Sequence, residues 1–332
     1  MESSDQSNWD RYATTVAFPT IGIILLGGIS NKIERRPLHN SAGIAYTGIK
    51  DKIDVETSVF FSKNETGVVN GEEVKDTGDR SPFRLLRKYR ESMDGKDQRK
   101  LSFISANHGV LSGSSDAAAA SFAKAVKSLA LRNIDEDVLE EDMRMISESA
   151  GRSYHGGLTI TETIPGKAVT RSLLEAQHFR GFELIGCRFS AVRNPSDRIH
   201  ENVVKNPNYE KRIASTRKKS ELLIDLAEER DIEGIFDLAG EDTIEYHTLL
   251  ESSGVYVITE GMRKFTQYLD TLKSEIWLNY IITGGSNVFV TVRESDSELI
   301  TSLASRFSFS PVELKVAGPP EVRSIRNRAF LA

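Results

Sequence analysis

The stretch that most constrains the fold is "LSFISANHGVLSGSSDAAAAS", residues 101–121. It begins as an apolar run typical of a strand, continues as a Gly/Ser-rich turn, and passes directly into a strong helix former. Such a turn brings unpaired backbone N–H groups together at a helix N-terminus, where the helix dipole favours an anion. The turn therefore either binds phosphate or is an ordinary helix start capped by Ser or Asp. The stretch alone does not choose between them.

Three better-known loops are excluded by the same residues. No lysine follows the glycine in the manner of a P-loop, and the dinucleotide pattern G-x-G-x-x-G is absent. A serine nucleophile at an exposed elbow requires G-x-S-x-G, and "GSSDA" lacks the second glycine. If the turn binds phosphate, it does so with backbone amides and serine hydroxyls.

Composition indicates a cytoplasmic globular protein. The 332 residues suffice for two domains, and 43 basic against 48 acidic residues give a net charge of −5, with no basic field for nucleic acid. The only cysteine, Cys187, excludes an intramolecular disulfide and a cysteine zinc site. The longest apolar run, residues 21–26, is too short to span a bilayer. We expect neither a nucleic-acid nor a membrane partner.

The predicted secondary-structure pattern changes near residue 200. Residues 13–61 form short apolar runs separated by Gly and Pro, typical of strands and hairpins, and a helix is predicted after Ser81 and Pro82. A further helix is predicted from Asp135 to a stop at Gly151. Beyond residue 200 the pattern is of long amphipathic helices and two strands around "GGSN". We therefore expect a loose tail (1–12), an N-terminal domain (13–195) and a C-terminal domain (196–332).

Five segments then occur in a fixed order: "LSGSSDA", "SESAGRS", "RNPSD", "GIFDLA" and "TGGSN". Each has an ordinary explanation when taken singly. Together, from about residue 17 to the "GGSNVFVTV" region, they resemble the GHMP kinase superfamily, in particular its mevalonate diphosphate decarboxylase branch and the archaeal mevalonate 3-kinases within it. The resemblance implies an α+β fold with an N-terminal α/β domain that carries the phosphate loop, a ferredoxin-like C-terminal domain and an active site in the cleft between them. It also implies a homodimer.

The sequence departs from the decarboxylases at two positions. Those enzymes carry a lysine in the first strand, where Leu25 or Leu26 stands here, and an aspartate in the last glycine turn, where Thr283 stands. Their arginine after the serine-rich segment is present as Arg152. The resemblance thus implies ATP-dependent phosphorylation of the tertiary 3-hydroxyl of mevalonate without loss of CO₂. The alternative is a phosphomevalonate or mevalonate 3,5-bisphosphate decarboxylase.

The substrate is expected to be small. The decarboxylases hold a 5-diphosphate with a tyrosine and a lysine after the first strand, whereas this chain reads "LGGISN" with no cation before Lys32. Mevalonate is therefore the first choice. Lys32, Arg35 and Arg36 either meet a 5-phosphate or, as we expect, form a solvated basic turn.

The resemblance assigns roles to particular residues. The expected ATP-binding residues are Ser112, Gly113, Ser114 and Ser115, with Ser115 as the Mg²⁺ ligand. The expected substrate-binding residues are Leu25, Ser149, Arg193 and Thr283, with Arg193 as a bidentate clamp on the mevalonate carboxylate. The expected catalytic residues are Glu148, Arg152 and Thr283.

Some assignments stay open. Glu148 lies four residues before Arg152, so it either orients the 3-hydroxyl and accepts its proton or forms a structural pair with Arg152. Asp116 follows the serine pair, where a carboxylate would repel phosphate; it either points away as a first-turn partner of the helix dipole or reaches substrate hydroxyls. The histidines show no metal-binding spacing, and His39, His155 and His200 receive no role beyond hydrogen bonding.

Overall fold

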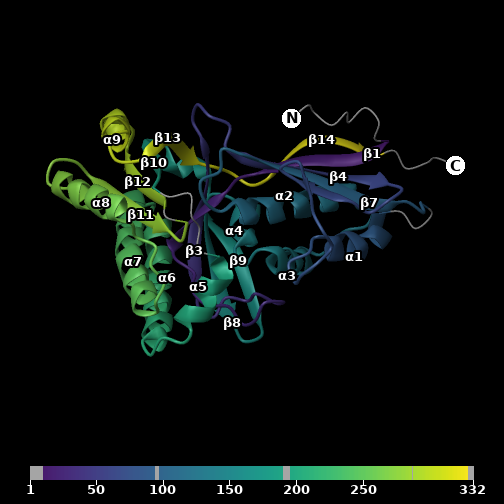
Figure 1. Ribbon diagram of the computed structural model, residues 1–332, viewed down its shortest axis with the longest axis horizontal. Coiled ribbons are helices and arrows are strands. Elements are labelled where there is room, and N and C mark those ends of the chain that lie inside the picture. Colours follow the sequence, from purple (N-terminus) through teal and green to yellow (C-terminus); the bar gives the residue numbers. More distant parts are fainter. Residues whose placement is uncertain (1–9, 94–96, 190–194, 286, 328–332) are drawn as a thin grey trace.

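The computed structural model describes residues 10–93, 97–189, 195–285 and 287–327. In this part of the chain the strands form two sheets (Figure 1). The first has the order β14 (Glu321–Asn327), β1 (Arg11–Ala17), β4 (Asp54–Ser62), β7 (Lys100–His108), β5 (Gly67–Val69), β6 (Glu72–Glu73). The second has the order β11 (Leu278–Thr283), β12 (Asn287–Arg293), β10 (Phe182–Arg188), β13 (Phe309–Val316), β3 (Ser41–Gly48), β8 (Leu158–Ile164), β9 (Lys167–Leu174), with β2 (Thr20–Ile24) paired to β3.

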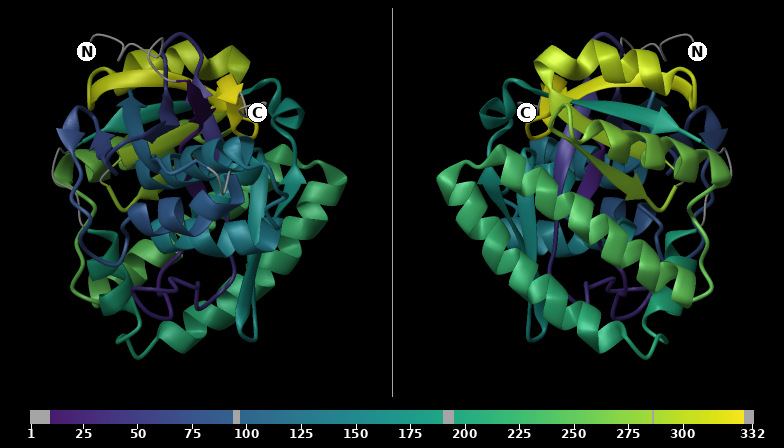
Figure 2. Two further views of the ribbon diagram at one scale, coloured as in Figure 1. Left: turned by 90° about the vertical axis from the view of Figure 1, so that its right-hand side faces the viewer. Right: turned by 90° about the vertical axis from the view of Figure 1, so that its left-hand side faces the viewer.

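Helices cover both sheets. Those of the first half are α1 (Phe83–Met93), α2 (Ser114–Leu129), α3 (Glu136–Ile146) and α4 (Ala150–His155). Those of the second half are α5 (Ser196–Val203), α6 (Tyr209–Glu229), α7 (Ile232–Ser252), α8 (Glu260–Leu272) and α9 (Ser297–Ala304), and two short 3₁₀ helices lie at Ala176–Phe179 and Glu294–Asp296. The right-hand view of Figure 2 looks onto the face where α6 and α7 pack together. No helix of the described segments is long and apolar enough to cross a membrane.

Helix α2 is the central support of the first half. Its alanine-rich face is buried against β1 and β4, so small side chains allow the helix to approach the sheet closely (Figure 1). Phe103 of β7 and Phe122 of α2 meet edge to face, with ring centroids 5.6 Å apart. Each Å² of apolar surface buried in this way stabilises the packing by about 25 cal/mol. The packing therefore fixes the position of the N-terminus of α2.

The two halves of the chain share their sheets. Strand β13 joins the second sheet beside β3, and β14 returns to pair antiparallel with β1. The predicted helix at 82 and the helix after the Gly/Ser turn are confirmed as α1 and α2, and the two strands around "GGSN" are β11 and β12. The domain boundary at residues 195 and 196 stays a prediction.

The helix predicted to run without a break from Asp135 to Gly151 is wrong. α3 ends at Ile146, Ser147 is extended (φ −148°), and a new helix begins at Ala150. Gly151 lies inside α4, where a Cβ would stand 2.8 Å from the Thr170 Cβ. The glycine therefore serves close packing of α4 against β9 and does not mark a helix stop. Glu148 and Ser149 consequently lie in a turn between two helices.

Candidate active site

Residues that are far apart in the sequence line one cavity of about 250 Å³. The cavity is bordered by the end of β2, the N-terminus of α2, the α3–α4 turn, the start of α5 and the β11–β12 turn. The predicted residues that line it are Leu25, Ser112, Gly113, Ser114, Ser115, Glu148, Ser149, Arg152 and Thr283. Arg193 lies outside the described residues, shortly before α5.

The Gly/Ser turn presents an uncapped helix N-terminus to the cavity. Gly113 is the N-cap of α2 with φ 75°, and no side chain of the described residues caps the helix there. The Tyr46 hydroxyl fixes the turn, because it donates to the Ser112 carbonyl (2.7 Å) and accepts from the Ser112 N–H (3.0 Å). The helix-capping explanation of the motif therefore loses its basis, and the free N–H groups fit an anion.

Asp116 braces the first turn of α2. Its carboxylate accepts hydrogen bonds from Thr20 Oγ1 and Ser147 Oγ, both at 2.6 Å. Burial raises the pKa of Asp116, although both hydroxyl groups act in the opposite direction. The Ser147 hydroxyl also lies 3.2 Å from Ser115 Oγ. Asp116 thus ties α2 to β2 and to the α3–α4 turn, a role that its sequence position did not indicate.

Glu148 is held by cations other than the one predicted. Arg35 donates from Nε (3.0 Å) and Nη2 (2.8 Å) to Glu148 Oε2, and His200 Nε2 lies 3.1 Å from Oε1. Burial alone would raise the pKa of Glu148, but His200, Arg35 and Arg80 together hold it well below its usual range. Of the two alternatives for Glu148, the structural pair with Arg152 is wrong, since α3 ends before Glu148 and the ion pairs of Glu148 among the described residues are to Arg35, Arg80 and His200.

The expectation of a solvated basic turn is also wrong for Arg35. Its side chain is fully buried and bridges Glu148 and Asp197, so it joins the α3–α4 turn to α5. Lys32 and Arg36 do pair at the surface, with Glu201 and Glu34. Of these three basic residues, Arg35 is thus buried and structural, whereas Lys32 and Arg36 lie at the surface.

Arg152 and Thr283 line the cavity, and both carry buried polar atoms without a hydrogen-bond partner among the described residues. These atoms are Nε and Nη2 of Arg152 and Oγ1 of Thr283. Burial lowers the pKa of Arg152 against the pull of Asp116 and Glu148. Gly43 leaves room for the Arg152 stem, since a Cβ there would stand 2.9 Å from its Cδ. Buried donors of this kind normally meet a partner, which here points to an anionic ligand.

Part of the cavity lining is apolar. Leu25 and Leu26, which follow β2, line the cavity together with Tyr246 of α7. In the described part of the chain no cluster of three His, Cys, Asp or Glu side chains suits a metal ion. The Ser115 side chain, on an exposed residue at the cavity edge, fits a cation that keeps most of its ligands from phosphate and water.

Comparisons with known proteins agree with this geometry. Residues 17–172 match the diphosphomevalonate decarboxylase-like N-terminal domain, and residues 194–298 match the mevalonate-3-kinase C-terminal domain. The mevalonate-3-kinase of Picrophilus torridus is 41% identical over 93% of this chain and 97% of its own, and the mevalonate 3-kinase of Thermoplasma acidophilum is 41% identical over 93% and 96%. The chain belongs to the mevalonate 3-kinase family.

Solved structures of this family have the same fold. The Thermoplasma acidophilum mevalonate-3-kinase with mevalonate bound matches with a TM-score of 0.90 at 39% identity, over 96% of this chain and 99% of that one. Its complex with mevalonate 3-phosphate and ADP matches with a TM-score of 0.89 at 38% identity, over 95% and 99%. The predicted α+β GHMP kinase fold is therefore confirmed, and so is membership of a family of small-molecule kinases.

Sequence reasoning missed several residues that line or support the site. Thr20, His200 and Tyr246 border the cavity, and Arg35 holds Glu148. No local signal marks them, because each comes from an element with a different sequence pattern. His200 is a partial exception, because it follows the "RNPSD" segment closely in the sequence.

Proposed function

We propose that the protein transfers the γ-phosphoryl group of ATP to the tertiary 3-hydroxyl of mevalonate and releases mevalonate 3-phosphate without decarboxylation. The observation that carries the proposal is that Arg152 and Thr283, each with a buried polar group that lacks a partner among the described residues, line the same cavity as the uncapped N-terminus of α2. One side suits a polyphosphate and the other suits a small carboxylate-bearing alcohol.

The phosphate loop would hold ATP through backbone N–H groups and the hydroxyls of Ser112, Ser114 and Ser115. ATP would bring Mg²⁺ with it, and the Ser115 hydroxyl is the protein ligand we assign to that ion. Bound Mg²⁺ supplies neutralisation of phosphate charge. The loop itself fixes the phosphate chain in position, which is the main requirement for a loose phosphoryl-transfer transition state.

Mevalonate would lie between the apolar wall and the α3–α4 turn. Arg193 and Arg152 are assigned to its carboxylate and to the transferring phosphoryl group, and Thr283 and Ser149 to hydrogen bonds with the substrate. Glu148 would orient the 3-hydroxyl. During transfer the bond between the γ-phosphorus and the β–γ bridging oxygen of ATP breaks, a bond from the 3-oxygen to that phosphorus forms, and the hydroxyl proton is released to water.

The decisive test is a panel of ATP-dependent reactions with mevalonate, its 5-phosphate and its 5-diphosphate, each labelled at C1. We expect ADP and a 3-phosphate from mevalonate, identified by ³¹P NMR, with no labelled CO₂. Labelled CO₂ would overturn the kinase assignment in favour of the decarboxylase alternative. ATP binding without turnover on any of the three would overturn both.

The assignment of Arg193 to the mevalonate carboxylate has its own test. Arg193→Ala should raise the KM for mevalonate by about tenfold or more, because a charge-assisted bidentate contact is lost. Arg198→Ala is the matched control, since Arg198 is exposed on α5 a few residues away. If Arg193→Ala and Arg198→Ala give the same KM, Arg193 does not bind the substrate.

The homodimer and the cytoplasmic location stay predictions. Light scattering on the purified protein tests the first. A species of 36.9 kDa at all concentrations would contradict it.

A further inference from the structure

The backbone from Leu25 to Gly28 has left the sheet, because β2 ends at Ile24. Side chains from distant elements take over its hydrogen bonds. These partners are Asp242 for the Leu25 N–H, Arg212 for the Leu25 carbonyl, Tyr246 for the Leu26 carbonyl, His39 for the Gly27 N–H, Tyr209 for the Gly27 carbonyl and His200 for the Gly28 N–H. The course of this segment is therefore set by His39 and by side chains of α5, α6 and α7 rather than by a strand ladder.

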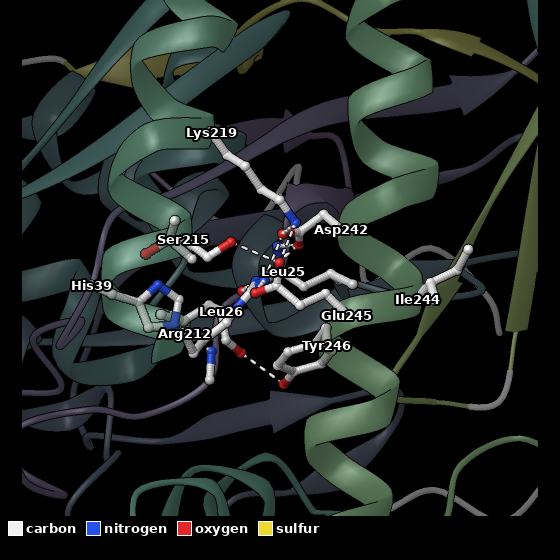
Figure 3. Close-up of polar contacts among 12 residues, drawn as sticks. Leu25, Leu26, His39, Arg212, Ser215, Lys219, Asp242, Ile244, Glu245 and Tyr246 are labelled. Carbon is white, nitrogen blue, oxygen red and sulfur yellow. Dashed lines mark hydrogen bonds and ion pairs between the residues drawn. The ribbon is translucent and has the colours of Figure 1, made fainter. Parts of the chain in front are cut away.

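Arg212 of α6 and Asp242 of α7 close around a single residue (Figure 3). The two side chains form a fork, with Nη1 to Oδ1 at 2.6 Å and Nη2 to Oδ2 at 2.9 Å. Asp242 Oδ2 then accepts from the Leu25 N–H and Arg212 Nη2 donates to the Leu25 carbonyl, both at 2.7 Å. We call these two residues the clamp.

The clamp is deeply buried and electrically balanced. Asp242 is fully buried and Arg212 is 2% exposed. Burial alone would raise the pKa of Asp242, but Arg212 and Lys219 hold it below its usual range, so it stays a carboxylate. Lys219 and Glu245 add one charge of each sign beside the clamp, and their ion pairs are with each other and with the clamp residues. Neither is a partner of the Leu25–Gly28 backbone in the described bonds.

A buried ion pair is a weak device for stability, because desolvation of both charges offsets most of their attraction. Its stronger effect is to specify one arrangement of the groups it bonds. Here those groups are the N–H and the carbonyl of Leu25, a residue whose side chain lines the cavity next to Leu26. The fork thus fixes the wall and not merely the contact between α6 and α7.

We propose that Arg212 and Asp242 are positioning residues that set where the Leu25–Leu26 wall stands, and thereby how closely the substrate fits. This inference rests on the proposed function, since it presumes that the wall faces mevalonate. The clamp touches no reacting atom. It acts through the backbone of Leu25, and the ATP side of the cavity lies at a different element, the start of α2.

The test compares two variants of the clamp with a neighbour in the same network. Asp242→Asn removes the charge that pairs with Arg212. Arg212→Lys keeps a cation beside Asp242, which protects folding, but a single ammonium cannot reproduce the fork and reach the Leu25 carbonyl at once. Glu245→Gln, one helical turn from Asp242 in α7, is the control because, within the described residues, Glu245 bonds Arg212, Lys219 and Ser215 and not the Leu25 backbone.

The readouts are kcat and KM for mevalonate, KM for ATP, and the melting temperature. We expect both clamp variants to lower kcat/KM for mevalonate on the order of 10- to 100-fold, as displacement of a substrate wall does, with the KM for ATP unchanged. Glu245→Gln should retain both constants. A clamp that served stability alone would lower the melting temperature without a selective loss in kcat/KM for mevalonate. That result would overturn the inference. Absence of mevalonate turnover by the unsubstituted protein would instead overturn the proposed function, and the inference with it.

Discussion

Replacement of Gly113 by alanine probes the phosphate loop most directly. Gly113 has φ 75°, a region in which an L side chain costs about 1–2 kcal/mol. A Cβ there would stand 2.5 Å from the Thr20 nitrogen and nearer still to the Thr20 carbonyl oxygen, although real Cβ contacts essentially never fall under 3.0 Å. Both neighbours are backbone atoms of β2. The loop and the strand must therefore separate by more than half an ångström.

Gly166 provides a matched control, because it has φ 76° and nothing within 4 Å of the position of a Cβ. Gly166→Ala should lower the free energy of unfolding only by the strain of a side chain at positive φ, about 1–2 kcal/mol. Gly113→Ala adds forced overlap of about 1–3 kcal/mol, giving about 2–5 kcal/mol in all. With an unfolding entropy of about 2.1 cal/mol/K per residue, these values correspond to a fall in melting temperature of about 1–3 °C and about 3–7 °C.

Calorimetry and steady-state kinetics check the reasoning together. Gly113→Ala should raise the KM for ATP by about tenfold or more, since the amides that would hold phosphate move with the loop. Gly166→Ala should leave that KM unchanged, because Gly166 lies in the β8–β9 turn. Equal melting temperatures for the two variants, together with an unchanged KM for ATP, would refute both the packing argument and the assignment of the loop.

Three further predictions concern buried ionisable side chains. Arg152→Met should lower kcat/KM for mevalonate by about 10²–10³-fold while leaving the protein at least as stable, because its Nε and Nη2 lack partners in the described structure; a clear loss in melting temperature would contradict this. Arg35→Met should destabilise by about 3–5 kcal/mol in urea unfolding, and Lys32→Met, from an exposed pair, by less than about 1 kcal/mol. Burial lowers the pKa of His39 to about 4, so the unfolded chain takes up the proton first and the free energy of unfolding should fall by up to about 3 kcal/mol between pH 6.5 and pH 4. His39→Asn should flatten that slope in urea unfolding at several pH values, and identical slopes would count against it.

The parts of the site that sequence could predict are local. A strand, a Gly/Ser turn and an alanine-rich helix are adjacent in the chain, so their pattern alone indicated a helix N-terminus at this turn, and only the family resemblance indicated that it binds phosphate. Leu25 and Thr283 were found differently, as departures from a family pattern at positions that line the cavity. Their spacing in the sequence carries no hint that they meet.

The parts that sequence could not predict depend on distant contacts. Arg35 and Glu148 are separated by 113 positions, and His200 and Glu148 by 52. Without the fold, the nearest cation to Glu148 is Arg152, and a helix through both residues was the natural expectation. The break after Ile146 removes it, because Ser147 is extended and its hydroxyl bonds Asp116. The break between the two helices thus occurs where Ser147 makes a tertiary hydrogen bond, which helix propensity alone does not predict.

The surroundings of Glu148 bear on how the proposed reaction proceeds. A carboxylate whose pKa lies well below its usual range is a weak proton acceptor, since base strength falls with pKa. Arg35 and His200 also fix both of its oxygens, which suits a group that orients a hydroxyl. Leu25 and Leu26, which line the same cavity, offer no second base. Phosphoryl transfer through a loose transition state tolerates this, because it requires alignment and charge neutralisation more than proton abstraction. Departure of the new phosphate with CO₂ would need further polar groups at that wall, so the arrangement favours release of the 3-phosphate itself.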